Sequence, residues 1–212
     1  MNKRGRPRGV SSIETRRRII ETARVEFSEK GFDGASIAQI AAQAQLAPSA
    51  IYNHYESKSK LYVAVFEDSA DNIWAEVSSA RLEITLVEAV MHLIESSRYL
   101  KERLPNHNNF LASVPIEARL HPEFSPLLNR RTKYQDETFN ALATIGINTG
   151  ELEGFTIEEG REFLRALIMG WFFERHFRGR EIPGSGEAII KAVKVLTDSS
   201  HLHRSHREYR KA

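Results

Sequence analysis

Hydroxyl, amide, imidazole and ammonium groups are concentrated between Ser36 and Lys58, a mixture that hydrogen-bonds phosphate oxygens and the edges of bases. The small residues Pro48, Ser49 and Ala50 fall in the first turn of an expected helix, where they suit close methyl and shape contacts with base edges. The other members that we expect to contact a duplex are Ser36, Tyr52, Asn53, His54 and Lys58. A second interpretation of the tyrosine is a core aromatic whose hydroxyl alone emerges.

Other groups of reactive side chains give weaker evidence for a functional site. His201, His203 and His206 have the chemistry of metal ligands, but they lie among arginines whose charges oppose a cation. We therefore interpret residues 201–212 as a disordered basic tail and expect no metal. The sequence has no nucleophile elbow, P-loop, dinucleotide motif or HExxH, so we expect neither an enzyme nor a cofactor.

Two short helices joined by a turn are expected to position the polar groups. The first begins at Ser36, with Gln39 three residues later as the second half of a capping box. A turn at 45–47 follows, and Pro48 suits the first position of the next helix. The inward-facing residues expected from the helical spacing are Ile37, Ile40, Ala41, Ala44, Leu46, Ile51 and Tyr55. This pattern predicts a helix-turn-helix.

The segment from Arg17 to about Phe66 resembles the N-terminal DNA-binding domain of the TetR family of bacterial repressors. The resemblance is carried by Ile20, Ala23, Phe27, Gly31, Ser36, Ile37, Ile40, Ala41, Ala44, Leu46, Ile51, Tyr52, Asn53, His54, Tyr55, Ser57, Lys58 and Leu61. Three positions depart from the family pattern. Gln45 stands where a turn glycine is usual, Ala47 replaces a capping serine, and Ser59 replaces an acidic residue. Either Gln45 adopts a left-handed conformation at a cost, or the turn is made differently.

The remaining sequence predicts helices throughout, so the expected fold class is all-α, with a three-helix N-terminal domain and a larger helical ligand-binding and dimerisation domain. The expected helices are 12–30, 58–80, 85–104, 123–146, 156–179 and 184–199, with a segment at 106–120 interrupted by Pro115. The expected divisions are a disordered basic arm at 1–10, the DNA-binding domain at 11–57, the larger domain at 58–200 and the tail at 201–212.

The expected helix at 156–179 is apolar on nearly every side, more than a single layer of helices covers. With the helix at 184–199 it is expected to form a four-helix contact with a second copy. The resemblance also implies a homodimer built on this pair. The alternative is a core helix in a monomer. The expected interface residues are Leu164, Ile168, Trp171, Phe172, Ile189, Val193 and Leu196.

Large apolar side chains with a few polar tips in the region 58–150 favour a ligand chamber. The expected lining residues are Trp74, Met91, His92, Phe110, Glu117, Tyr134 and Phe139. Ordinary core packing is the alternative for each of them. The resemblance implies that a small-molecule inducer binds here, tilts the long helix that begins at Lys58 and so releases DNA.

Positive charge is concentrated at one end of the chain. Of the 30 Lys and Arg and the 28 Asp and Glu, eleven and six respectively fall within residues 1–66, as expected when only that end meets a polyanion. Arg4, Arg6 and Arg8 lie in an arm that suits an A·T-rich minor groove, or that merely adds screened attraction. Arg17 is expected to face phosphates, or to belong to a solvated helix face.

The sequence has no cysteine and no apolar run of about 18 residues, so we expect a cytoplasmic protein without a membrane span or a secretion signal. Together, the residues and the resemblance predict a ligand-responsive repressor that binds a near-palindromic DNA operator as a homodimer and is released by an inducer. A ligand-independent architectural DNA-binding protein and a helical small-molecule carrier are the alternatives.

Overall fold

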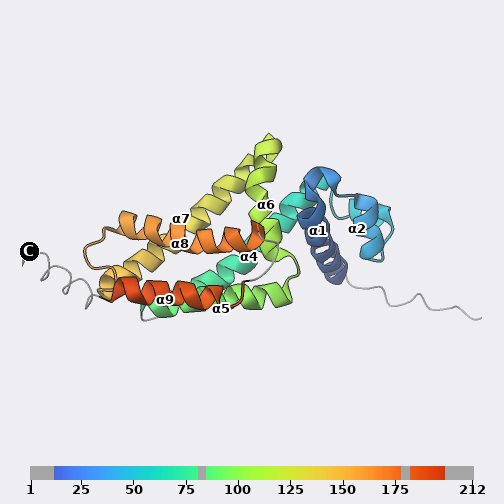
Figure 1. Ribbon diagram of the computed structural model, residues 1–212. Coiled ribbons are helices and arrows are strands. Elements are labelled where there is room, and N and C mark those ends of the chain that lie inside the picture. The colour runs from blue at the N-terminus through green and yellow to red at the C-terminus, as the bar shows by residue number, and fades with distance from the viewer. Residues whose placement is uncertain (1–11, 81–84, 178–181, 199–212) are drawn as a thin grey trace, which may run out of the picture. The chain divides into compact units, whose positions relative to one another are not determined.

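All regular structure in the described residues is helical (Figure 1). The computed structural model describes residues 12–80, 85–177 and 182–198, without the side chains of 73–80 and 177. The helices are α1 (Ser12–Gly34), α2 (Ile37–Gln43), α3 (Pro48–Tyr52), α4 (Lys58–Ala80), α5 (Leu86–Arg103), α6 (His107–Leu120), the 3-10 helix η1 (Pro122–Phe124), α7 (Ser125–Asn148), α8 (Ile157–Phe177) and α9 (Ser185–Thr197). The all-α prediction is confirmed.

Most helix boundaries agree with the spacing of apolar residues and of helix-ending residues. The exception is Pro115, because α6 runs without a break from His107 to Leu120 and the predicted interruption is wrong. A proline removes one intrahelical hydrogen bond, but packing on both sides can hold the helix together. Here Val114 and Ala118 are both buried, so the helix has a core-facing side through the proline turn.

The chain divides into two compact units. The first contains the residues up to Ser69 together with Leu104–Leu127, and the second contains Ala70–Arg103 together with the residues from Leu128 onward. The unit that holds α1, α2 and α3 therefore also takes in the first half of α4 and all of α6, beyond the segment 11–57 expected for the DNA-binding domain.

An aromatic cluster forms the core of the first unit. Tyr62 of α4 lies at its centre, with its ring centroid 5.0 Å from Phe27, 5.2 Å from Phe110 and 4.5 Å from Phe124. Phe32 packs edge-to-face against Phe124, with the ring centroids 4.8 Å apart. Edge-to-face and offset pairs of this kind add to the stability from apolar burial. Phe110, expected in a ligand chamber, belongs to this core.

Glu117 of α6 holds the end of α1. The helix breaks at Gly31, as predicted, with φ 69° and ψ 179°. At the next residue, the backbone N–H of Phe32 donates to Glu117 Oε1 at 3.0 Å. The other carboxylate oxygen lies 3.6 Å from His121 Nε2, which is also 3.4 Å from Asp33. Glu117, a second residue expected in the ligand chamber, therefore satisfies a buried amide in the first unit.

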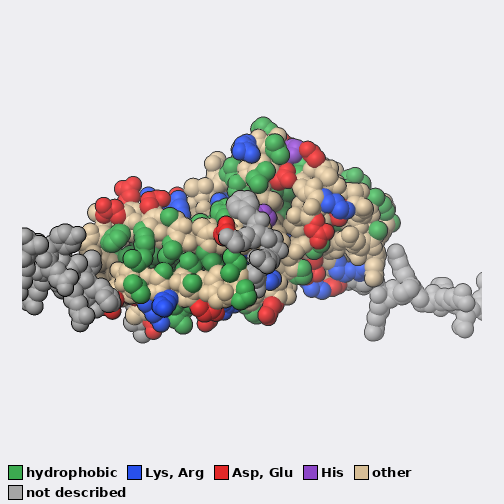
Figure 2. Space-filling model, in the orientation of Figure 1, with side chains coloured by type: hydrophobic (Ala, Val, Ile, Leu, Met, Phe, Trp, Pro, Cys, Tyr) green, Lys and Arg blue, Asp and Glu red, His purple; other side chains and the backbone are tan. Residues whose placement is uncertain are grey.

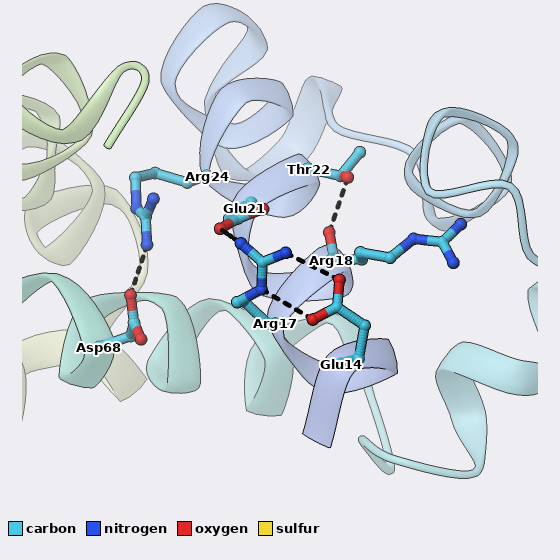
Figure 3. A network of polar contacts seen from close by, with 7 residues as sticks. All are labelled: Glu14, Arg17, Arg18, Glu21, Thr22, Arg24 and Asp68. Carbon is cyan, nitrogen blue, oxygen red and sulfur yellow. Dashed lines mark hydrogen bonds and ion pairs between the residues drawn. The ribbon is translucent and has the colours of Figure 1, made fainter. Parts of the chain in front are cut away.

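A buried guanidinium joins α1 to α4 (Figure 3). Arg24 is fully buried, its Nε donates to Ser69 Oγ at 3.1 Å, and its Nη2 pairs with Asp68. Burial lowers the pKa of Arg24, while the Asp68 carboxylate opposes that shift. Replacing Asp68 would leave the buried guanidinium without its counter-charge, so the pair links the two helices.

His107 should make the protein less stable in mild acid. Its side chain is buried and neither ring nitrogen has a partner in the described residues, and burial, with a smaller effect of Arg24, lowers its pKa from 6.5 to about 3. Between these values the unfolded chain binds the proton and the folded chain does not, so the free energy of unfolding falls as pH falls below about 6.5.

This effect can be measured by urea unfolding at pH 7.5 and pH 5.0. From His107 alone we expect a loss of about 2 kcal/mol between the two. His107→Leu should remove that part of the pH dependence while keeping the fold at pH 7.5. An equal loss in wild type and variant would show that the histidine is protonated in the folded state.

The core of the second unit is formed by α5, α7, α8 and α9. Its buried apolar members are Leu86, Ala89, Val90, Ile94, Phe139, Leu142, Ala143, Leu152, Leu164, Ile168 and Val193. Glu151, in the turn after α7, accepts hydrogen bonds from the backbone N–H groups of Leu86 at 2.6 Å and Val87 at 3.1 Å and so caps α5. Figure 1 shows α8 and α9 side by side in this unit. None of the helices in the described residues is long and apolar enough to cross a membrane.

Candidate nucleic-acid interface

The turn between α2 and α3 is closed by two backbone hydrogen bonds. Leu46 N donates to Ala41 O at 2.8 Å and Gln45 N donates to Ala42 O at 3.0 Å, the paired bonds of a Schellman motif. Gln45 occupies the position usually taken by glycine, and its φ of 54° is left-handed. The first of the two predicted possibilities is therefore confirmed, and the turn keeps the ordinary geometry despite the missing glycine.

The predicted capping box at the start of α2 is wrong. Ser36 is the N-cap residue, but its side chain makes no capping hydrogen bond. Gln39 Oε1 instead accepts from Lys30 Nζ at 2.8 Å, and the same ammonium pairs with Glu26 Oε1 at 2.9 Å. The side chain of Gln39 therefore contacts α1 and does not reach back to Ser36, and the hydroxyl of Ser36 does not cap α2.

The recognition element is the five-residue helix α3. Ile51 and Tyr55 are buried and anchor it, as predicted. Pro48, Ser49 and Asn53 are exposed, Ala50 and His54 are half-buried, and Tyr52 is 54% exposed. Because the ring of Tyr52 stands at the surface, its interpretation as a core aromatic is wrong.

The basic residues near the start of α1 differ in their partners (Figure 3). Arg17 pairs with Glu14 at 2.7 Å and Glu21 at 2.9 Å. Arg18 donates to Ala44 O, a carbonyl at the end of α2, and so helps to hold the two helices together. Arg16 lies 6.0 Å from the centre of the Tyr55 ring. Arg17 is therefore neutralised within its own helix in the free protein.

Lys58 holds the loop that precedes α2. Its ammonium donates to Asp33 O at 3.2 Å and Ala35 O at 3.1 Å, and it lies 4.6 Å from the centre of the Phe32 ring. Ser57 accepts from Lys60 N at 3.1 Å and caps α4. These contacts fix the position of Lys58, the residue predicted to contact a phosphate, before any DNA is bound. Arg4, Arg6 and Arg8 lie outside the described residues.

The residues expected in a ligand chamber are divided between the two units. Phe110 and Glu117 belong to the first unit, whereas Met91, His92, Tyr134 and Phe139 belong to the second. Within the second unit Phe139 is part of the core, and the others are half-buried. The side chain of Trp74 lies outside the description.

The residues expected at a dimer interface fall into two groups, buried core residues and residues that are at least partly exposed. Leu164, Ile168 and Val193 are buried in the core of one subunit, so they are not available to a second copy. Trp171, Phe172 and Ile189 are half-buried and Leu196 is exposed. Helical spacing groups these apolar residues but does not distinguish core positions from interface positions, because both are apolar.

Several known proteins are similar to this chain. Residues 19–65 match the sequence model described as bacterial regulatory proteins, tetR family. The HTH-type transcriptional repressor AcnR of Corynebacterium efficiens is 23% identical over 184 residues, which cover 85% of this chain and 92% of AcnR. The TetR family regulator PfmR from Thermus thermophilus has a TM-score of 0.65 at 21% identity, covering 85% of this chain and 97% of PfmR. FadR from Bacillus subtilis, solved in complex with stearoyl-CoA, has a TM-score of 0.66 at 20% identity, covering 86% of this chain and 97% of FadR.

The three N-terminal helices and the exposed α3 define a helix-turn-helix DNA-binding regulator on an all-helical fold. The match to the tetR family model runs from α1 into α4, so in its helix-turn-helix region the chain is similar to the TetR family of bacterial regulatory proteins.

Proposed function

We propose that the protein is a repressor that binds a near-palindromic operator as a homodimer and leaves it when a small molecule binds. The observation that carries this proposal is the exposure of one side of α3, with Pro48, Ser49, Tyr52 and Asn53 facing outward around the buried anchor Ile51. Two such helices, one per subunit, suit half-sites one helical turn or a multiple of it apart. We place the protein in the cytoplasm, where its proposed DNA target lies.

Selection from a random duplex library tests DNA recognition directly. The full chain should enrich a sequence with two related, inverted half-sites and bind it more tightly than random duplex across a range of salt concentrations. An architectural DNA-binding protein would enrich no such sequence, and a small-molecule carrier would bind neither duplex. Failure to enrich a symmetrical site with folded protein would overturn the proposal.

Tyr52 provides a specific variant for the selected operator. Tyr52→Ala should leave the free energy of unfolding almost unchanged, because the ring is exposed. Operator affinity should fall about a hundredfold or more, since each hydrogen bond to a charged group contributes about 1.5 kcal/mol or more and the dimer loses two. The matched control is Tyr99→Ala on α5, because this tyrosine is 50% exposed and lies in the other unit. Equal effects of the two substitutions would contradict the role of Tyr52.

The proposed dimer surface combines an exposed stripe of α8 with an exposed side of α9. Ala166 and Gly170 are one turn apart on the exposed side of α8. On α9, Val195 is 53% and Leu196 58% exposed, and Ala188 is exposed as well. Figure 2 shows apolar side chains gathered over these two helices. Small residues at a helix crossing allow a close approach, and exposed branched residues gain from burial.

A ligand response is proposed for the second unit. FadR, which has the same fold, was solved with a bound acyl-CoA, so in that protein the fold accommodates a ligand. Here the remaining chamber candidates are Met91, His92 and Tyr134, which are half-buried on α5 and α7. A ligand releases DNA only if it binds the DNA-incompetent arrangement more tightly. Release of the selected operator on titration with a small molecule is the corresponding test.

A further inference from the structure

Arg131 of α7 is a half-buried arginine without a carboxylate partner in the described residues. Its Nη1 donates to Gln135 Oε1 at 3.3 Å, and its Cζ lies 5.8 Å from the centre of the Phe173 ring. The neighbouring Arg130 differs, because it pairs with Asp71 at 3.2 Å. A half-buried guanidinium is only partly hydrated, so an anion bound at Arg131 would supply the counter-charge that its surroundings lack.

The groups around Arg131 are weak hydrogen-bonding partners. Gln135 Nε2 donates to the sulfur of Met169 at 3.4 Å, and a thioether is a weak acceptor. Further along the same pair of helices, Arg165 of α8 pairs with Asp136, but its Nε is buried and has no hydrogen-bond partner in the described residues. Of these two arginines, only Arg165 has a carboxylate partner within the described residues, namely Asp136.

Burial alone perturbs Arg131. It lowers the pKa of the guanidinium, and no acid among the described residues opposes the shift, in contrast to Arg24, where Asp68 does. An arginine remains protonated at neutral pH even so. The positive charge is thus present and lies among Met169, Phe173 and a neutral amide.

We propose that the seam of Arg131, Gln135, Met169 and Phe173 binds the acidic headgroup of an amphipathic small molecule. The planar guanidinium pairs with a carboxylate or phosphate through two parallel hydrogen bonds. Met169 and Phe173 contact the apolar part of the molecule next to its headgroup. This inference rests on the proposed ligand response and specifies its chemical class.

Calorimetric titration of the full chain with four probes of equal chain length tests the proposal. Octanoate and octyl phosphate carry the acidic groups, octan-1-ol is neutral and octylammonium is cationic. One or both acids should bind about tenfold or more tightly than the alcohol, because charge-assisted bonds are about twice as strong as neutral ones. The cation should bind more weakly than the alcohol. The two acids distinguish a carboxylate from a phosphate headgroup.

Two adjacent arginines supply matched variants. Arg131→Gln should remove the preference for the acid over the alcohol, and Arg131→Lys should keep part of it. Arg130→Gln removes the same charge one residue away and should keep the preference in full. Circular dichroism and thermal unfolding show whether each variant is folded, and the comparison of wild-type probes requires no variant.

Four results would overturn the proposal. In the first, neither acid binds more tightly than octan-1-ol, and in the second, Arg131→Gln leaves the preference intact. In the third, Arg130→Gln removes it equally, which indicates a general effect of charge. In the fourth, Arg131→Gln weakens self-association in sedimentation but not acid binding, which assigns the guanidinium to a carboxylate of a second copy. Operator selection is independent of these titrations, so failure of DNA recognition is seen separately.

Discussion

Gly31→Ala is expected to lower the free energy of unfolding by about 3 kcal/mol, as the sum of backbone strain and a steric clash. Gly31 has φ 69° and ψ 179°, a region almost restricted to glycine. A Cβ at this position would lie 2.7 Å from Glu117 Oε1. That oxygen cannot move away freely, because it accepts the hydrogen bond from Phe32 N. Urea unfolding of wild type and variant at pH 7.5 measures the loss.

A second glycine separates the two contributions. Gly150 has φ 77°, and a Cβ there would meet no atom within 4 Å. Gly150→Ala should therefore show only the backbone contribution, about 1 kcal/mol. The excess cost of Gly31→Ala combines the contact with Glu117 and the additional backbone strain at ψ 179°, and the part that disappears in a Glu117→Ala background reports the contact. If the two alanine variants were equally stable, α6 would not hold the end of α1 rigidly.

Gly170→Arg is expected to abolish the homodimer without unfolding the subunit. Gly170 is exposed in the middle of α8, and a Cβ there would have no atom within 4 Å. The substitution also replaces glycine in a helix interior, which favours the helix by up to about 1 kcal/mol. At the proposed crossing with a second copy, however, the long charged side chain would prevent close approach. Sedimentation at micromolar concentration should therefore give a monomer. Thermal unfolding should show that this monomer is a folded subunit.

Loss of the dimer should also weaken binding to DNA. Two linked reading helices bind a two-part operator far more tightly than one, so affinity for the selected operator should fall about a hundredfold or more. Thr144→Arg is the matched control, because it adds the same charge at an exposed position on α7. A Gly170→Arg protein that remains a dimer would place the interface elsewhere on the subunit.

The local part of the candidate site could be predicted from the sequence. Helical spacing identified α2 and α3, and the buried anchors Ile51 and Tyr55 follow from it. The absence of a turn glycine pointed to strain at Gln45, whose φ is 54°. Two further capping boxes were open to the same reasoning but were missed, Thr85 with Glu88 and Thr156 with Glu159.

Side-chain partners distant in sequence could not be predicted. Glu117 reaches Phe32 across 85 positions and Glu151 reaches Leu86 across 65, and each carboxylate accepts from a backbone N–H that no local pattern assigns to it. The Ser36 box failed for the same reason, because Gln39 has a better partner in Lys30 on another helix. Which apolar residues of α8 and α9 are core also depends on neighbours, since Val193 is buried and Leu196 is not.

Periodicity and helix-ending residues predicted the helices of the described residues, and these patterns, together with the charge of residues 1–66 and the resemblance to the TetR family, predicted a DNA-binding element near the N-terminus. These properties depend on neighbours within a few positions along the chain, which a sequence displays directly. The tertiary structure alone decided that Glu117 holds α1, that Arg24 is paired with Asp68, and that Arg131 has no carboxylate partner within the described residues. Those outcomes depend on which helices pack together, and only packing sets the distance between charges and their access to water.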